Sequence, residues 1–215
     1  MESPHLNCSI VSPGRTAVAA RLRAGRAAAL VVAAVGAACG GKDPYAPVAQ
    51  YNTVDYAFVL YPMRTVVAPQ NSALDLHAPA PTRPAVYVSS VLNAVVPNFD
   101  VAFDVDNTGH PVLLPPKLVT SAQILPRTGF QTSSTLFDSL KAAPGGTYQA
   151  DSAFRVTTGQ TVVVQAQGTA CSVASPFYSR LVVDSIGAAT GALYIRARID
   201  PNCGFKSFAS GVPSS

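Results

Sequence analysis

Short segments in which every second residue is apolar constrain the fold of this chain more than any other feature. The clearest example covers residues 99–106, whose apolar positions are Phe99, Val101, Phe103 and Val105. A period of two places such side chains on one face of an extended strand. We therefore expect these four side chains to point into a core. The opposite, outward face is then expected to carry Asp100, Asp104 and Asp106.

Several other segments have the composition of short strands separated by turns. The expected strands are Val54–Tyr61, Arg64–Ala68, Ala85–Ser90, Pro111–Leu114, Leu118–Leu125, Phe154–Thr157, Thr161–Gln167, Tyr178–Ile186 and Ala192–Asp200. Residues 107–110 and 187–191 are rich in turn formers and predict two hairpins. The proline-rich stretch 69–84 is expected to be a loop.

The composition favours strands over helices, because the only Glu is Glu2 and β-branched and aromatic residues are frequent. One short helix is expected near 134–142, since Ser133, Ser134 and Thr135 can cap it and Pro144 follows. Seven to nine short strands predict an all-β fold, an antiparallel β-sandwich of immunoglobulin-like or related type, with a small β-barrel as the alternative. Residues 51–215 are expected to form this single β-rich domain.

The residues before this domain have the pattern of a bacterial export signal. Four arginines precede the apolar run Ala27–Ala38, which has 12 residues and ends in the small residues Gly36, Ala37 and Ala38. A run of this length is typical of a signal peptide and too short to cross about 30 Å of hydrocarbon as a helix.

This stretch resembles the lipobox of bacterial lipoproteins, in which three residues precede a cysteine that becomes lipid-modified. Ala37, Ala38 and Cys39 match that pattern, while Gly36 stands where Leu or Val is usual. The resemblance implies that 1–38 is a signal peptide, that Cys39 carries the lipid, and that 39–50 is an anchor and flexible tether. It predicts an exported protein on the periplasmic or surface face of an envelope membrane. Ordinary secretory cleavage after Ala38 and an uncleaved segment are the alternatives.

An exported domain with two cysteines most simply pairs them. With Cys8 in the leader and Cys39 at the anchor, Cys171 and Cys203 remain, and they would close a loop of about 32 residues. Two buried free thiols are the alternative. A zinc site is disfavoured because it needs two further ligands and histidine is scarce, so no cofactor is expected.

The charge argues against a nucleic-acid partner. Residues 1–38 hold four Arg and one Glu, or +3 of the net +4, which leaves +1 for the remainder. A nearly neutral chain has no electrostatic footprint for a polyanion.

The run from Asp104 to Thr108 is similar to the DxDxT motif of haloacid-dehalogenase-type phosphatases, in which two aspartates act beside Mg²⁺. That resemblance implies a parallel α/β sheet, whereas this chain shows no such alternation and Gly109 favours a hairpin. The Asp104, Asp106 and His110 region supports the alternative of an envelope hydrolase or metal-assisted enzyme. Asp100, Asp104 and Asp106 are also candidate Ca²⁺ ligands.

The remaining candidates are interpreted as surface residues. His77 and His110 lie in expected loops and are most simply solvated. Arg180, Arg196 and Arg198 suggest an anion or glycan contact, although a solvated face with salt bridges to Asp184 and Asp200 is favoured. The sequence therefore predicts a non-catalytic, lipid-anchored binding or interaction module. Its partners would be the membrane, through the lipid, and an unknown envelope protein, glycan or small ligand.

Overall fold

The computed structural model describes residues 48–65, 67, 70–76, 85–86, 99–121, 127–167 and 175–213. These belong to one compact unit, Pro47–Ser215. The predicted signal peptide, Cys39, His77 and Cys171 lie outside the described residues. Among the described residues, none forms a helix with the length and apolarity needed to span a membrane.

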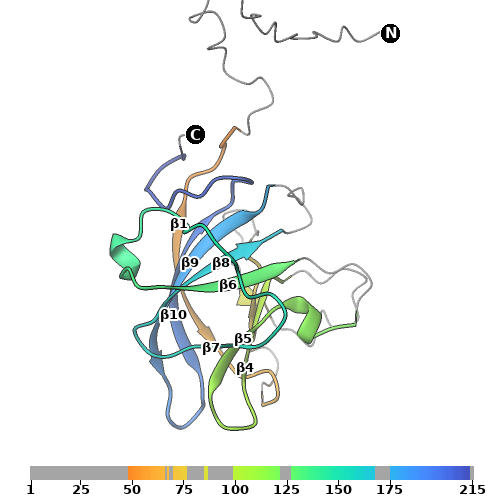
Figure 1. The fold of residues 1–215 in the computed structure, drawn as a ribbon. Helices are drawn as coiled ribbons and strands as arrows, with labels where there is room; N and C mark the ends of the chain where they lie inside the picture. The colour runs from red at the N-terminus through yellow and green to blue at the C-terminus, as the bar shows by residue number, and fades with distance from the viewer. Residues whose placement is uncertain are drawn as a thin grey trace, which may run out of the picture. The chain divides into compact units, whose positions relative to one another are not determined.

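The fold consists of two five-stranded antiparallel sheets (Figure 1). The first has the order β1-β10-β9-β8-β6, formed by Val54–Leu60, Leu193–Asp200, Phe177–Ile186, Thr161–Ala166 and Thr128–Ser133. The second has the order β3-β2-β4-β5-β7, formed by Ala85–Val86, Ala73–Leu74, Val101–Val105, Pro111–Leu114 and Phe154–Arg155. Each sheet is open and ends in two edge strands, so the sandwich prediction is confirmed and the barrel alternative is wrong.

The main core lies between the sheets and takes side chains from both. Leu181 and Ile195 reach it from the first sheet, and Phe103 and Leu113 reach it from the second. These four side chains are at most 2% exposed. β10 alternates between buried and exposed residues from Leu193 to Ala197, whereas the first seven residues of β9 are buried on both faces.

β4 departs from the predicted alternation. Val101 and Phe103 face the main core as expected, but Phe99 precedes the strand and packs with Ala102 in a separate cluster. A bend at Asp100 shifts the pattern by one residue. Asp104 follows Phe103 and lies on the face opposite the main core, as predicted. That second face is also covered, so Asp100 and Asp104 are buried, and the expectation of a solvated face is wrong.

Both predicted hairpins are confirmed. β4 pairs with β5 from Val105↔Pro111 onward, and Gly109 closes that turn with a φ of 84°. This left-handed conformation favours glycine. β9 pairs with β10 from Ile186↔Leu193 onward, with a register shift between Tyr194 and Ile195.

The segment around 134–142 forms one 3-10 turn, η3 (Phe137–Ser139), instead of the expected helix. Leu140 is extended with a ψ of 105°, and no side chain caps the turn. The start of the expected strand Leu118–Leu125 is likewise a 3-10 turn, η2 (Pro116–Leu118), and Arg64 lies in a turn. Strands β2 and β6 were not predicted.

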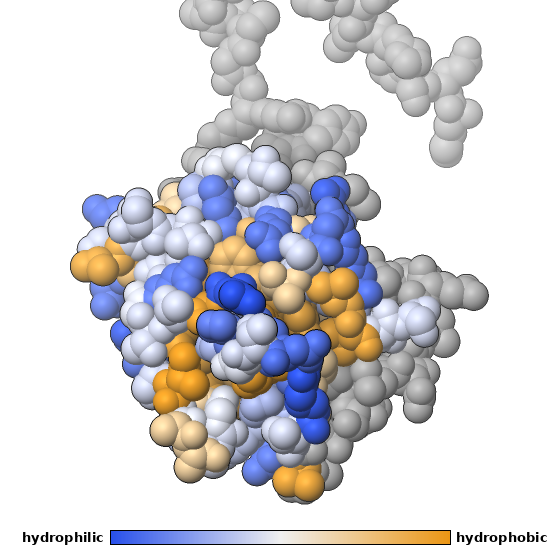
Figure 2. All heavy atoms as spheres, turned by 60° about the horizontal axis from the view of Figure 1, so that its bottom comes forward, coloured by the Kyte–Doolittle hydropathy of each residue, from blue (hydrophilic) through white to orange (hydrophobic). Residues whose placement is uncertain are grey.

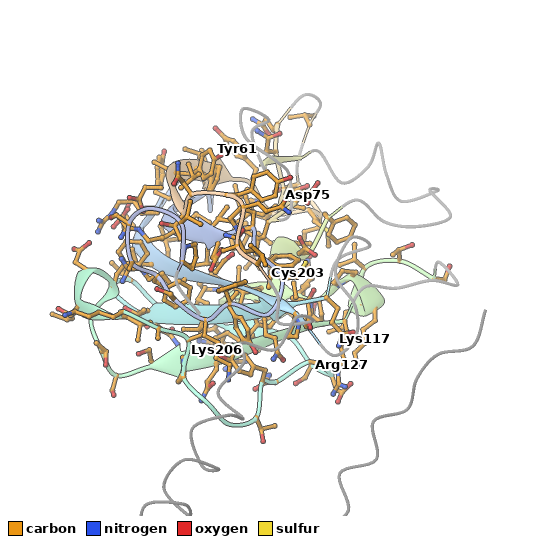
Figure 3. The ribbon with its side chains drawn as sticks, turned by 90° about the horizontal axis from the view of Figure 1, so that it is seen from above. Tyr61, Asp75, Lys117, Arg127, Cys203 and Lys206 are labelled. Carbon is orange, nitrogen blue, oxygen red and sulfur yellow. The ribbon has the colours of Figure 1, made fainter. Side chains whose placement is uncertain are left out.

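One end of the domain is organised by Asn202. Its Oδ1 accepts hydrogen bonds from the N–H groups of Gln50 (2.8 Å) and Tyr51 (3.0 Å), and its side chain donates to Asp200 Oδ1 at 2.6 Å. Cys203 lies near the middle of this end when it is viewed from above (Figure 3) and is disulfide-bonded. Since Cys171 is outside the described residues, its pairing with Cys203 stays a prediction.

Asp200 is fully buried, its Oδ2 has no hydrogen-bond partner among the residues that the structure describes, and burial raises the pKa of this carboxyl. A raised folded-state pKa means that stability is full below the unfolded pKa of about 3.9 and falls as pH rises through the folded pKa. Asp200→Asn keeps the Oδ1 acceptor and removes the ionisable group. We expect the variant to be at least as stable as wild type at pH 7, with a flatter pH profile, in urea melts between pH 4 and 7. A loss of more than about 1 kcal/mol at pH 7 would contradict this.

Candidate functional site

The β4–β5 turn is held by the side chain of Asp106. Its Oδ1 accepts hydrogen bonds from Thr108 Oγ1 (2.7 Å), Thr108 N (2.8 Å) and His110 N (3.0 Å). Oδ2 accepts one from Arg155 Nε at 3.0 Å. The hydrogen bond from the Thr108 hydroxyl, with the backbone donors, holds the pKa of Asp106 far below its usual range. Asp106 is therefore an ionised hydrogen-bond acceptor that stabilises the turn, and it is unsuited to donating a proton.

The other two aspartates have separate partners. Asp104 Oδ2 accepts a hydrogen bond from Arg64 Nε at 3.1 Å, and Asp100 Oδ2 accepts one from Leu76 N at 2.8 Å. Across the part of the chain that the structure describes, no three His, Cys, Asp or Glu side chains come together as a metal site. The predicted group of Asp100, Asp104 and Asp106 is not assembled.

His110 lies on the exposed side of the same turn, and its Nδ1 is 2.7 Å from Thr108 Oγ1. Figure 2 shows this end of the domain, where charged and apolar residues are interspersed. A shallow hollow here is lined by Arg64, Val105, Asp106 and Thr190 among others, without Asp104 or His110. Asp106 and His110 do come together, with His110 Nδ1 3.6 Å from Asp106 Oδ1, whereas Asp104 is held separately by Arg64. The three residues of the hydrolase alternative therefore do not converge in one pocket, and the antiparallel sheets differ from the fold that the DxDxT resemblance implies.

A second group of charged residues covers the outer face of the first sheet. Arg196 Nε donates to both carboxylate oxygens of Asp184, at 3.1 and 3.0 Å, so the predicted Asp184 salt bridge is confirmed. Arg198 makes two hydrogen bonds to Asp55, and these lower the pKa of Asp55. The predicted salt bridge to Asp200 is wrong, because that residue is buried against Asn202.

Arg180 is the exception on this face, because it is only 3% exposed and no ion pair among the described residues includes it. Its guanidinium lies 4.6 Å from the ring centre of Phe137 and 5.6 Å from that of Phe208, and Nη1 donates to the carbonyl of Leu140. Burial lowers the pKa of Arg180. Arg180 therefore links the sheet to the η3 segment, through Phe137 and Leu140, and to the C-terminal segment, through Phe208.

The Phe137 ring also contacts Arg196, whose guanidinium is 5.2 Å from the ring centre. A hollow of about 370 Å³ opens beside them, lined by Asp55, Tyr56, Ala57, Phe137, Asp138, Arg196, Ala197 and Arg198. Asp138 lies at its rim with a side chain 81% exposed, and its Oδ1 is 3.9 Å from Arg196 Nη1. Of the two carboxylates beside Arg196, Asp138 is the more weakly held. The hollow thus combines two arginines, Arg196 and Arg198, with two carboxylates, Asp55 and Asp138, beside the buried ring of Phe137.

Sequence reasoning identified the arginines of this hollow and missed Phe137, Asp138 and Asp55. Asp138 and Asp55 are aspartates without a distinguishing pattern around them. Phe137 lies in the segment for which the sequence predicts a helix. No family model, no curated protein and no solved structure matches this chain. The class of protein is therefore defined by its fold and site: an all-β, sandwich-like domain with an arginine-and-aromatic hollow on one sheet.

Proposed function

We propose that this chain is an exported, lipid-anchored binding module of the cell envelope, and that the hollow beside Phe137 and Arg196 binds an acidic glycan. The lipobox-like residues that end in Cys39 support the anchor. The ligand class rests on one observation, the placement of Arg196 between the buried ring of Phe137 and the loosely held Asp138.

An anionic ligand is expected to interact more strongly with Arg196 than the Asp138 carboxylate does. Asp138 is held at the limit of an ion pair and is exposed, so its displacement costs little. A ligand carboxylate can approach the guanidinium at normal hydrogen-bond distance, which gives a stronger, charge-assisted contact. An acidic sugar offers this carboxylate. The Phe137 ring, which is only 7% exposed and lies against the guanidinium groups of Arg180 and Arg196, positions Arg196 for that contact.

The ligand proposal is tested by titrating the full chain in detergent with a glucuronic-acid oligosaccharide, with a neutral glucose oligosaccharide for comparison. Arg196→Gln is expected to weaken binding by tenfold or more, since a hydrogen bond to a charged group contributes about 1.5–3 kcal/mol. Asp138→Asn is expected to strengthen binding because it removes the competing carboxylate. Arg155→Gln, at the β4–β5 turn, is the matched control and should bind as wild type does. Equal affinity for both oligosaccharides, or weaker binding by Asp138→Asn, would refute an anionic site here.

The anchor is tested separately. Cys39→Ser is expected to move the protein from the membrane fraction to the soluble envelope fraction, and intact-mass analysis of the wild type should show a diacylglycerol at residue 39. A wild-type chain without that lipid would refute the anchor and leave the ligand test unaffected.

A further inference from the structure

The end of the domain at which the chain enters is held together by hydrogen bonds between distant segments. Besides its contacts described above, Asn202 Nδ2 donates to the carbonyl of Tyr51 at 2.8 Å. Thr53 N donates to Gly211 O at 3.1 Å, and Thr53 Oγ1 donates to Ala209 O at 2.7 Å. The entering segment and the C-terminal segment are therefore fixed side by side. We call this surface the tether end.

Exposed apolar side chains gather at the tether end. Of the seven large hydrophobic residues that are exposed among those described, three lie here: Val48, Tyr51 and Val212, which are 79%, 55% and 51% exposed. The residue before Val212 is hydrogen-bonded to Thr53, which places Val212 beside the segment that carries Tyr51. An exposed apolar group of this kind is typical of an interaction site.

Two exposed basic residues lie at the same end of the first sheet. Asp200, the last residue of β10, pairs with Tyr178, and Lys206 Nζ is 5.8 Å from the ring centre of Tyr178. Arg127 directly precedes β6, whose first residue pairs with the last residue of β8 in the same row. Figure 3, drawn from above, labels both cations. No ion pair within the described part of the chain includes Arg127 or Lys206.

The carboxylates near the tether end do not offset these cations. Each described one is buried, half-buried or paired with a cation: Asp200, Asp75, Asp55 with Arg198, and Asp151 with Lys117. The exposed and unpaired charge of this end is therefore positive. Basic residues beside exposed aliphatic and tyrosine side chains are the combination that binds the headgroup region of an anionic bilayer.

The tether keeps this end of the domain near the membrane. Val48 follows Cys39 by nine residues, so a lipid at Cys39 holds Val48 within about 32 Å of the bilayer even when the tether is fully extended. The β9–β10 turn lies at the other end of a ten-residue strand, about 33 Å further along. Because the anchor makes docking intramolecular, the weak affinity of a small patch is sufficient.

We propose that the tether end docks on an anionic lipid surface, with Val48, Tyr51 and Val212 in the headgroup region and Arg127 and Lys206 against lipid phosphates. This docking depends on the proposed lipid anchor. Tyrosine favours such a boundary because its ring is apolar and its hydroxyl is polar. The docked domain directs its β4–β5 and β9–β10 turns away from the membrane, and the ligand hollow on the first sheet opens to the side.

Tryptophan reporters locate the docked face, because the chain contains no tryptophan. The lipidated chain is reconstituted in vesicles of phosphatidylcholine and phosphatidylglycerol that contain brominated lipids, which quench tryptophan at the bilayer. Tyr51→Trp and Val212→Trp should each show blue-shifted and strongly quenched emission. Ala189→Trp, exposed in the β9–β10 turn, is the matched control and should show neither effect.

The basic residues are tested in the Tyr51→Trp chain. Arg127→Gln combined with Lys206→Gln should weaken docking about tenfold or more and reduce the quenching, because each cation near an anionic surface adds to binding. Vesicles of phosphatidylcholine alone should reduce the quenching in the same way. Arg155→Gln, at the β4–β5 turn, is the control for a lost surface charge and should leave the quenching unchanged.

The outcomes separate the docking from the anchor. A chain that floats with the vesicles but is quenched equally, or not at all, at residues 51 and 189 overturns the docking and leaves the anchor in place. A chain that does not float with the vesicles overturns the anchor and the docking with it. Quenching at residue 51 that needs an added envelope protein assigns this face to a protein partner and overturns the lipid surface.

Discussion

Phe103→Ala is expected to lower the free energy of unfolding by about 3–5 kcal/mol, the usual loss for a large aromatic side chain in a closed core. Phe103 is fully buried and belongs to the cluster that both sheets share. Its removal leaves a cavity lined by β-sheet residues whose backbones are fixed by the ladders on either side, so little collapse can compensate.

Urea melts followed by far-ultraviolet circular dichroism measure this loss. Phe103→Leu is the conservative comparison and should lose clearly less, because it keeps most of the apolar volume. Asp104→Asn should lose about 1 kcal/mol through its hydrogen bond with Arg64. If Phe103→Ala lost less stability than the roughly 1 kcal/mol expected for Asp104→Asn, the region between the sheets would not be a closed core.

Cys203→Ala is expected to cost roughly 3–4 kcal/mol, from the entropy of closing a loop of the predicted length in the unfolded chain. The structure gives Cys203 a disulfide, and the sequence predicts Cys171 as the partner. Cys171→Ala should then lower the melting temperature as much as Cys203→Ala does. Reducing agent should not lower the melting temperature of either variant further. Peptide mapping that joins Cys203 to another cysteine would contradict the predicted pairing.

The strands that were predicted correctly carry their own pattern. β10 alternates buried and exposed residues from Leu193 to Ala197 because one of its faces is solvated, and turn residues mark both hairpins. β6 has no such pattern: Phe130 is its one large apolar residue, and pairing with β8 along all six residues makes it a strand. Strands defined by their neighbours cannot be recognised from local sequence.

The same limit applies to the candidate sites. Asp104 was assigned to solvent because its partner, Arg64, lies 40 residues earlier in the chain. The hollow depends on Arg198 and Asp55, which are 143 residues apart, and on η3, where Leu140 ends the turn after three residues. A list of titratable residues identifies members of such clusters but not the contacts that decide their ionisation.

The hydrogen bond from Thr53 N to Gly211 O brings the first and last described segments side by side, at the end of the domain opposite the β9–β10 turn (Figure 1). The domain is therefore suited to circular permutation: a short linker joins these segments, and the chain is reopened at 187–191. Such a permutant would keep every strand pair, including β9 with β10. It would lose only the covalent connection between these two strands. If the permutant were attached to a surface through its new terminus, the β9–β10 end of the domain would face that surface and the opposite end would face away from it.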